Sequence, residues 1–204
     1  MFKKFFNQTR KPNGFGGRLM LSMMNKGHTN ISLWGLDQLS SIQPHRIVDL
    51  GCGGGANIAR LLKRFKHAKV LGIDYSLESV TATRNFNEEE IRDGRLDVIE
   101  GNVLHLPISD ESYDLATAFE TVYFWPGPVE SFKEVYRILK HEGEFMIVNE
   151  VSCRDEKSKK WEEIIDGMVI YNIDELKSFL MEVGFVIAHA NVDRNKLCVI
   201  AKKR

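Results

Sequence analysis

Four glycines and an acidic residue gather in the stretch IVDLGCGGGANIARLL, residues 47–62. Asp49 stands just before the glycines, which are Gly51, Gly53, Gly54 and Gly55. Glycine is costly to order and offers no side chain to pack. Between a strand and a helix, however, it lets a ligand approach the free backbone N–H groups at the positive end of the helix. The stretch therefore predicts a site for a nucleoside-bearing cofactor.

A second acidic residue supports this interpretation. Asp74 ends the next apolar run, KVLGIDY, and lies 23 residues beyond Gly51. At about this separation an acidic side chain can accept hydrogen bonds from both hydroxyls of a ribose. We therefore expect the glycine loop and Asp74 to bind the same ligand.

Two classes of cofactor share this arrangement. The run from Gly51 to Ala56 fits the dinucleotide pattern G-x-G-x-x-A, and S-adenosylmethionine (SAM) is the alternative. Asp49 favours SAM, because it suits a ligand's ammonium group and would repel a pyrophosphate. A chain of 204 residues also leaves little room for the separate catalytic domain of most dehydrogenases. It closes, moreover, with an expected hairpin instead of further parallel strands.

The elements that must position these residues alternate along the chain. Apolar runs predict strands at 46–51, 69–75, 96–102, 113–120, 143–151, 185–192 and 196–203. Amphipathic patterns predict helices at 57–65, 76–94, 128–140, 155–166 and 173–183. This alternation predicts an α/β fold: a Rossmann-like, doubly wound, mostly parallel seven-stranded sheet with an antiparallel C-terminal hairpin and helices on both faces.

Charge and composition exclude several classes of protein. Lys plus Arg equals Asp plus Glu at 28 each, so the chain lacks the basic excess of a dedicated nucleic-acid binder. No run of about 18 apolar residues is present, so we expect no membrane insertion. Three well-separated cysteines suit a reducing compartment and predict a cytoplasmic protein. Six scattered histidines show no metal-ligand spacing, so no metal site is expected.

The charge distribution is uneven at the N-terminus. Residues 1–36 contain six Lys or Arg and no Asp or Glu. This arm could touch an anionic surface, but we interpret it as a frayed, solvated terminus.

Four further stretches occur in a recognisable order and spacing: VDLGCGGG, GIDYS, IEGNVLHLPISDESYDLATAFET and FKEVYRILKHEGEFMIVNE. Together they resemble the motifs of class I SAM-dependent methyltransferases, most of all the small-molecule branch related to ubiquinone/menaquinone C-methyltransferases. The resemblance covers residues 45–150. It implies methyl transfer from SAM to a small organic molecule, with S-adenosylhomocysteine as product. It also implies a methyltransferase domain over 45–204, preceded by a basic arm and helical lid over 1–44.

The resemblance assigns residues to the methionine end of SAM. The loop would hold this part through Asp49, Gly51, Cys52, Gly53 and Gly55, with Cys52 as a small filler and not a nucleophile. Glu120, at the end of the fourth strand, would lie near the sulfonium.

At the other end of SAM, Asp74 would bind the ribose and Tyr75 would flank the adenine. Asn102 and Val103 stand where the family reads the adenine amino group, often with an aspartate. Asn102 departs from that pattern, but its amide oxygen can still accept a hydrogen bond.

The methyl acceptor has weaker candidates. Tyr123, with Phe124 and Trp125, follows the fourth strand and could form the wall of an apolar pocket; packing beneath the next helix is the alternative. The family often uses the segment before the first strand as a lid, which makes His28 a possible base and Trp34 a pocket wall. Glu150 ends the fifth strand and could face the same cleft.

Four functions stay open on the sequence alone. The leading hypothesis is an enzyme that methylates a small molecule. A methyltransferase acting on nucleic acid or protein is the second, although ETVYFWP replaces the Pro-Pro-aromatic motif of amino-methylating DNA enzymes and the neutral charge argues against nucleic acid. A non-catalytic SAM-binding protein and a nicotinamide oxidoreductase are the others. Sequence alone gives no oligomeric state.

Overall fold

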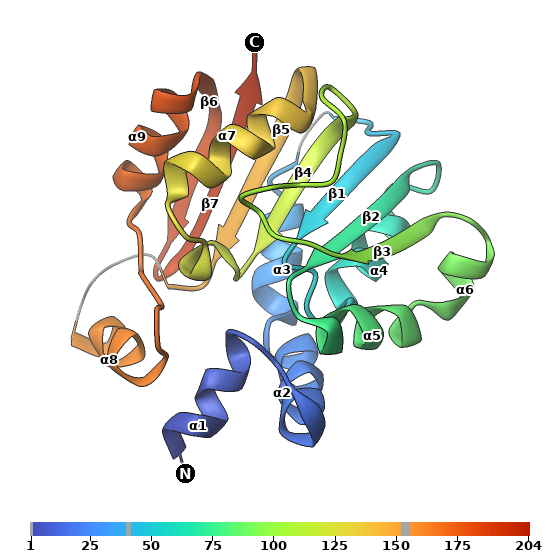
Figure 1. Ribbon diagram of the computed structural model, residues 1–204. Helices are drawn as coiled ribbons and strands as arrows, with labels where there is room; N and C mark the ends of the chain where they lie inside the picture. Colours follow the sequence, from blue (N-terminus) through green and yellow to red (C-terminus); the bar gives the residue numbers. More distant parts are fainter. Residues whose placement is uncertain (1, 40–41, 152–155) are drawn as a thin grey trace.

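A single seven-stranded sheet organises the computed structural model, which describes residues 2–39, 42–151 and 156–204 (Figure 1). The strand order is β3-β2-β1-β4-β5-β7-β6. The strands are β1 (Arg46–Leu50), β2 (Lys69–Asp74), β3 (Leu96–Glu100), β4 (Tyr113–Phe119), β5 (Leu139–Asn149), β6 (Phe185–Asp193) and β7 (Lys196–Lys203).

The sheet reverses direction at its C-terminal side. Strands β1 to β5 pair in parallel, whereas β7 pairs antiparallel with both β5 and β6. The predicted mixed sheet with its closing hairpin is therefore confirmed. The chain order changes side at β1, which lies between β2 and β4, so the carboxyl ends of these strands form a topological switch point.

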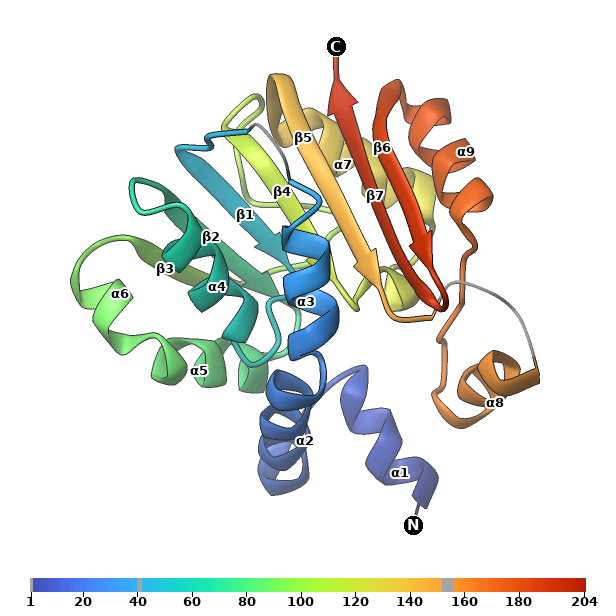
Figure 2. The same cartoon turned by 180° about the vertical axis from the view of Figure 1, so that it is seen from behind.

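Two helical layers cover the sheet (Figures 1 and 2). On one face lie α7 (Pro128–Ile138) and α9 (Ile173–Val183), which bury Phe132, Val135, Leu176 and Leu180. On the other face lie α3 (Thr29–Leu36), α4 (Ala56–Arg64) and α5 (Leu77–Phe86). In α4, apolar residues three and four apart place Ile58, Leu61 and Leu62 on the buried side.

Three other helices cap the carboxyl edge of the parallel strands. They are α1 (Phe2–Phe6), α2 (Gly14–Gly27) and α8 (Glu156–Ile164) (Figure 1). A short 3-10 turn, η1 (Asn7–Thr9), follows α1, and η2 (Val122–Phe124) follows β4. Residues of these helices and of the sheet edge line two cavities. None of the helices in the described part of the chain has the length and apolar character needed to cross a membrane.

The N-terminal arm differs from the expected frayed end. Lys3 forms an ion pair with Asp166 at 2.8 Å, and the Asn7 side chain bonds to both the carboxylate and the backbone N–H of Asp166. Further along, the Ser76 hydroxyl donates to the Pro12 carbonyl at 2.8 Å. Contacts to remote segments therefore order the arm, which its own composition did not indicate.

The expected helix at 76–94 is divided in two. Asn87 ends α5 and begins α6 (Glu88–Arg92). Its buried side-chain amide donates to the carbonyls of Thr83 and Gly55. The break therefore has a function in the fold, because it fastens the glycine loop from behind. Of the helix expected at 155–166, residue 155 lies outside the described residues and α8 covers Glu156–Ile164.

Candidate active site

The glycine loop leaves β1 and enters α4 through a tight turn. The N–H groups of Gly51 and Cys52 both donate to the Ile73 carbonyl, which fixes the loop to β2. A Cβ on Gly51 would lie 2.2 Å from the Thr121 hydroxyl, so packing within the protein requires glycine there. At Gly53 the nearest atoms to such a Cβ are Cδ2 of Leu21 at 3.9 Å and the Gly51 carbonyl oxygen at 4.0 Å. Gly53 therefore leaves open space.

Asp74 connects the loop to the next strand. Its Oδ2 accepts from the Gly53 N–H at 3.0 Å, and its Oδ1 accepts from the Ser76 N–H at 2.9 Å. Burial raises the pKa of Asp74, and these bonds to the carboxylate oppose the shift. The side chain is thus held in place before any ligand arrives.

A first cavity opens between these groups and the N-terminal arm. It brings together seven of the predicted cofactor residues: Gly51, Gly53, Asp74, Tyr75, Asn102, Val103 and Glu120. The N-terminal arm contributes Thr9, Arg10 and Pro12 to the lining. The ends of four parallel strands and a remote segment therefore share one site. Sequence reasoning missed the arm, whose only signal was its lack of acidic residues.

The other three predicted residues lie outside this lining. Asp49 is buried behind the loop, where its Oδ1 accepts from the Thr117 hydroxyl at 2.7 Å. Burial raises its pKa to about 7. Cys52 is buried too, and burial raises the pKa of its thiol, as suits an unreactive filler. A Cβ on Gly55 would meet the Asn87 amide at 2.6 Å, so this glycine serves packing.

On the side of the cavity expected to bind adenine, Tyr75 and Asn102 have contacts within the protein. The Tyr75 hydroxyl donates to the Arg10 carbonyl, and Lys11 Nζ lies 5.3 Å from the centre of the Tyr75 ring. Oδ1 of Asn102 accepts from the Leu104 N–H at 3.0 Å. The oxygen that we expected to read the adenine amino group is therefore already engaged in its own loop.

A second cavity of about 660 Å³ adjoins the first. Its walls are mainly apolar and include Phe6, Met20, Met23, Phe124, Trp161, Ile165 and Met168. Glu120 lines both cavities, together with Thr9, Met24 and Phe124. The volume of the second cavity is in the range of small-molecule sites. Trp34, which we expected in such a wall, lies outside the described cavity linings and packs instead beside the core under α3 and α4.

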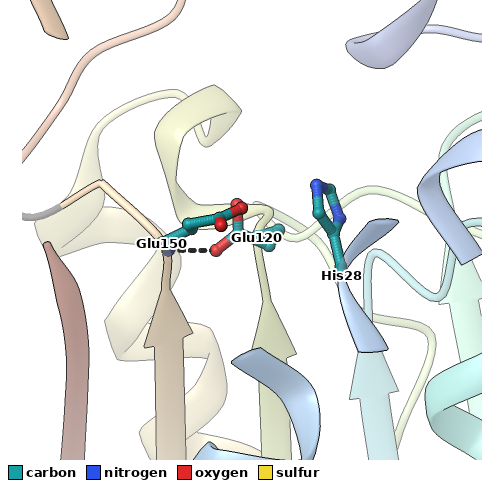
Figure 3. Close-up of side chains that lie close together, drawn as sticks. All are labelled: His28, Glu120 and Glu150. Atoms are coloured by element: carbon teal, nitrogen blue, oxygen red, sulfur yellow. Dashed lines mark hydrogen bonds between the residues drawn. The ribbon is translucent and has the colours of Figure 1, made fainter. Parts of the chain in front are cut away.

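Three titratable side chains converge where the cavities meet (Figure 3). His28 precedes α3, Glu120 follows β4, and Glu150 follows β5. One ligand-type atom from each lies within 4.8 Å of the others. The Glu150 N–H donates to the Glu120 carboxylate, as the dashed line in Figure 3 marks. The histidine and the two carboxylates come from three separate segments, so spacing in the sequence could not reveal their grouping.

The surroundings set the protonation of this group. Burial lowers the pKa of His28, against the opposing charge of Glu150. Burial also raises the pKa of Glu120 to about 8, and the charge of Glu150 adds to that shift. Near neutral pH, His28 is therefore neutral and able to accept a proton, whereas Glu120 holds one. An imidazole and two carboxylates are also a ligand set that suits a divalent cation.

Tyr123 lies beside this group with its hydroxyl engaged. The hydroxyl accepts a hydrogen bond from the Val151 N–H at 2.9 Å and donates one to the Val151 carbonyl at 3.3 Å. The residue is 3% exposed, and burial raises the pKa of its phenol well above the usual value. Tyr123 is therefore a neutral phenol that holds the chain after β5.

Comparison with known proteins agrees with this geometry. Residues 48–147 match the family described as "Methyltransferase domain". The 24-methylenesterol C-methyltransferase 2 of Oryza sativa subsp. japonica is 30% identical over 160 residues, which cover 74% of this chain and 44% of that protein. Methyltransferase phqN of Penicillium fellutanum is 32% identical over 106 residues, 52% of this chain and 32% of that protein. The chain thus spans less than half the length of these relatives.

Solved structures share the fold. A SAM-dependent methyltransferase from Aquifex aeolicus superposes with a TM-score of 0.75 at 18% identity, covering 92% of this chain and 98% of that one. A chain from the complex between the Haloferax volcanii Trm112 methyltransferase activator and the putative methyltransferase gives 0.79 at 21% identity, covering 90% and 93%. The strand order, the glycine loop and the matched residues agree with a methyltransferase domain over residues 48–147.

Proposed function

We propose that this chain transfers a methyl group from SAM to a small organic molecule with an apolar body. The observation that supports this best is the meeting of two cavities at Glu120. One cavity contains the glycine loop and Asp74, and the other has apolar walls. A cofactor in the first and an acceptor in the second would face each other at this junction. Such alignment is the main requirement of a methyl transfer.

The residues of the first cavity fit SAM. The open space at Gly53 admits a ligand close to the backbone, and Asp74 is held as an acceptor for ribose hydroxyls. When bound, SAM supplies an activated methyl group on a sulfonium. Glu120 would lie at the sulfonium end. Asp49 would act from behind the loop, through the Thr117 bond that joins β1 to β4.

The residues of the second cavity fit an acceptor that loses a proton. His28 is neutral near pH 7 and lines the cavity together with Glu120 and Glu150. We assign His28 as the base that takes the acceptor's proton, and Glu150 as the group whose charge stabilises the resulting imidazolium. Tyr123 enters this proposal as a positioning residue, because its hydroxyl fixes the chain next to Glu150.

Transfer of a labelled methyl group tests the proposal. The purified full chain would be incubated with tritiated SAM and a panel of apolar alcohols, phenols, amines and carbon nucleophiles, beside tRNA, DNA and protein. We expect label in one or more small acceptors and none in the polymers. Label only in a polymer would overturn the small-molecule assignment. SAM binding with no transfer to any class would favour a non-catalytic SAM-binding protein.

A further inference from the structure

One face of α2 is apolar although it points to solvent. Phe15 is 77% exposed, Leu19 is 47% exposed and Met23 is 52% exposed. Residues four apart lie on one side of a helix, so these three form a continuous stripe. The opposite side of α2 is the buried one, with Gly17, Met20 and Leu21. Contiguous apolar surface of this kind marks an interaction site more often than a scattered exposed residue does.

The same segment carries exposed positive charge. Arg18 and Lys26 share the outer side of α2 with the stripe, and Lys3, Arg10 and Lys11 are exposed nearby. Acidic residues from outside the segment pair with two of these, Asp166 with Lys3 and Glu78 with Arg18. For Lys11 and Lys26 the described residues provide no acidic partner within ion-pair distance. The face is therefore both apolar and cationic.

The stripe leads to the rim of the acceptor cavity. Met23 belongs to the stripe and also lines that cavity. Across the opening, Trp161 of α8 is 38% exposed, lines the same cavity and packs edge-to-face on Phe6 of α1, with ring centres 5.5 Å apart. Both ribbon views place α1 and α2 beyond the carboxyl edge of the sheet, at the end of the molecule farthest from the chain's C-terminus (Figures 1 and 2).

We propose that this face, defined by Phe15, Leu19, Met23 and Lys26, docks on the surface of a membrane that contains anionic lipids. An amphipathic helix with apolar residues flanked by Lys and Arg lies in the interface of such a membrane, without spanning it. Its cations are attracted by the negative surface potential. Docking in this way would turn the mouth of the acceptor cavity toward the lipid. That consequence rests on the proposed function, whereas the docking itself does not.

The charge of the face selects lipid over a second copy of this chain. In a two-fold symmetric pair, the same patch would meet itself. The contact would then gather the cations of both copies, among them Lys26, without adding an acidic partner for them, which is unfavourable. An anionic headgroup instead supplies the opposite charge. A dimer is therefore the competing outcome of the test.

Vesicle co-sedimentation of the full chain tests the docking. Vesicles of phosphatidylcholine alone would be compared with vesicles that also contain phosphatidylserine, at low and high salt. We expect binding to the anionic vesicles that weakens with salt. The double variant Phe15→Ser, Leu19→Ser should reduce the bound fraction about tenfold, because it removes the two exposed apolar side chains of the face that line neither cavity. Lys26→Glu should reduce binding to the anionic vesicles alone.

Met181→Ser provides the matched control. Met181 is 55% exposed on α9, away from α2, so this variant should bind vesicles as the wild type does. Calorimetry with SAM, done on every variant without vesicles, reports folding and tests the proposed function separately. Failure of the wild type to bind anionic vesicles would overturn the docking. Equal vesicle binding by the wild type and the Phe15, Leu19 double variant would also overturn it. A wild-type dimer in ultracentrifugation that the double variant dissociates would show that the face binds a second copy of the chain and would overturn the docking too.

Discussion

The first and second cavities together form a cleft, and we call them its cofactor half and its acceptor half. The two halves are built in different ways. The cofactor half consists of the ends of adjacent parallel strands, and its key contacts join Gly53, Asp74 and Ser76 within 23 residues of chain. The acceptor half combines α1, α2, α8 and the turn between β6 and β7, which are far apart in sequence. The first half is therefore specified by local motifs, and the second depends on tertiary assembly. Substitutions in the two halves should affect different steps.

The largest effect is expected at the glycine loop. Gly53→Val should reduce SAM affinity by at least about 100-fold, because its side chain would fill the open space beside Asp74. Gly94→Val is the matched control: Gly94 also has a positive φ, of 70°, but nothing lies within 4 Å of an added Cβ. Both variants carry the strain of a left-handed backbone, about 1–3 kcal/mol. If calorimetry shows equal SAM affinity for Gly53→Val and Gly94→Val, the proposed position of SAM beside Gly53 is wrong.

The next effect belongs to the acceptor half. His28→Gln should lower kcat by about 100-fold or more and leave the affinity for SAM unchanged, since it removes the proposed base. Wild-type activity should fall as the pH drops below 6.5, where His28 begins to bind a proton, and the variant should lose this dependence. His141→Gln, on an exposed histidine in β5, is the control for the substitution itself. A pH profile unchanged by His28→Gln would remove His28 from the reaction.

A smaller effect is expected at Asp74. Asp74→Ala should weaken SAM binding by about 1–3 kcal/mol through the loss of a charged hydrogen-bond acceptor. Asp97→Ala, at an exposed carboxylate on β3, should bind SAM normally. Calorimetry would measure both. Wild-type affinity in Asp74→Ala would exclude this residue from the cofactor site.

Glu120 gives a test through stability. Folding raises its pKa from 4.5 to about 8, so the unfolded chain releases this proton first as the pH rises. The free energy of unfolding should therefore fall between about pH 4.5 and pH 8, and Glu120→Gln should reduce that fall by about 1–3 kcal/mol. Urea unfolding at pH 5 and pH 8 would measure the difference. Asp49 titrates in an overlapping range, but it is present in both proteins and cancels. If the free energies of unfolding of the wild type and of Glu120→Gln change equally with pH, Glu120 is not held in its protonated form.

Much of the fold followed from patterns in the sequence. The strand alternation, the hairpin at β6 and β7, and the position of Asp74 are local features, and the structure confirms the predicted sheet. The break between α5 and α6 at Asn87 was not predicted. The Asn87 side chain donates a hydrogen bond to the glycine loop at this point. The sequence carries a local signal for a second helix start, because Asn87 is followed by three glutamates, but nothing in it indicates the bond to the glycine loop.

The acceptor half could be predicted only in part. His28 and Glu150 were recognisable as candidates one at a time, but their approach to Glu120 depends on how α3 packs against the sheet. Thr9 and Arg10 line the cofactor cavity because the arm bonds to Asp166 and Tyr75, residues that lie 156 and 65 positions from Arg10. Long-range contacts of this kind leave no periodicity in the sequence.

The most direct measurement is isothermal titration of the purified chain with SAM, S-adenosylhomocysteine and NAD side by side. The account predicts micromolar or tighter binding of the two adenosyl ligands and none of NAD. Binding of NAD alone would contradict it, because the open space at Gly53 would then serve a dinucleotide pyrophosphate and the reaction would be a hydride transfer.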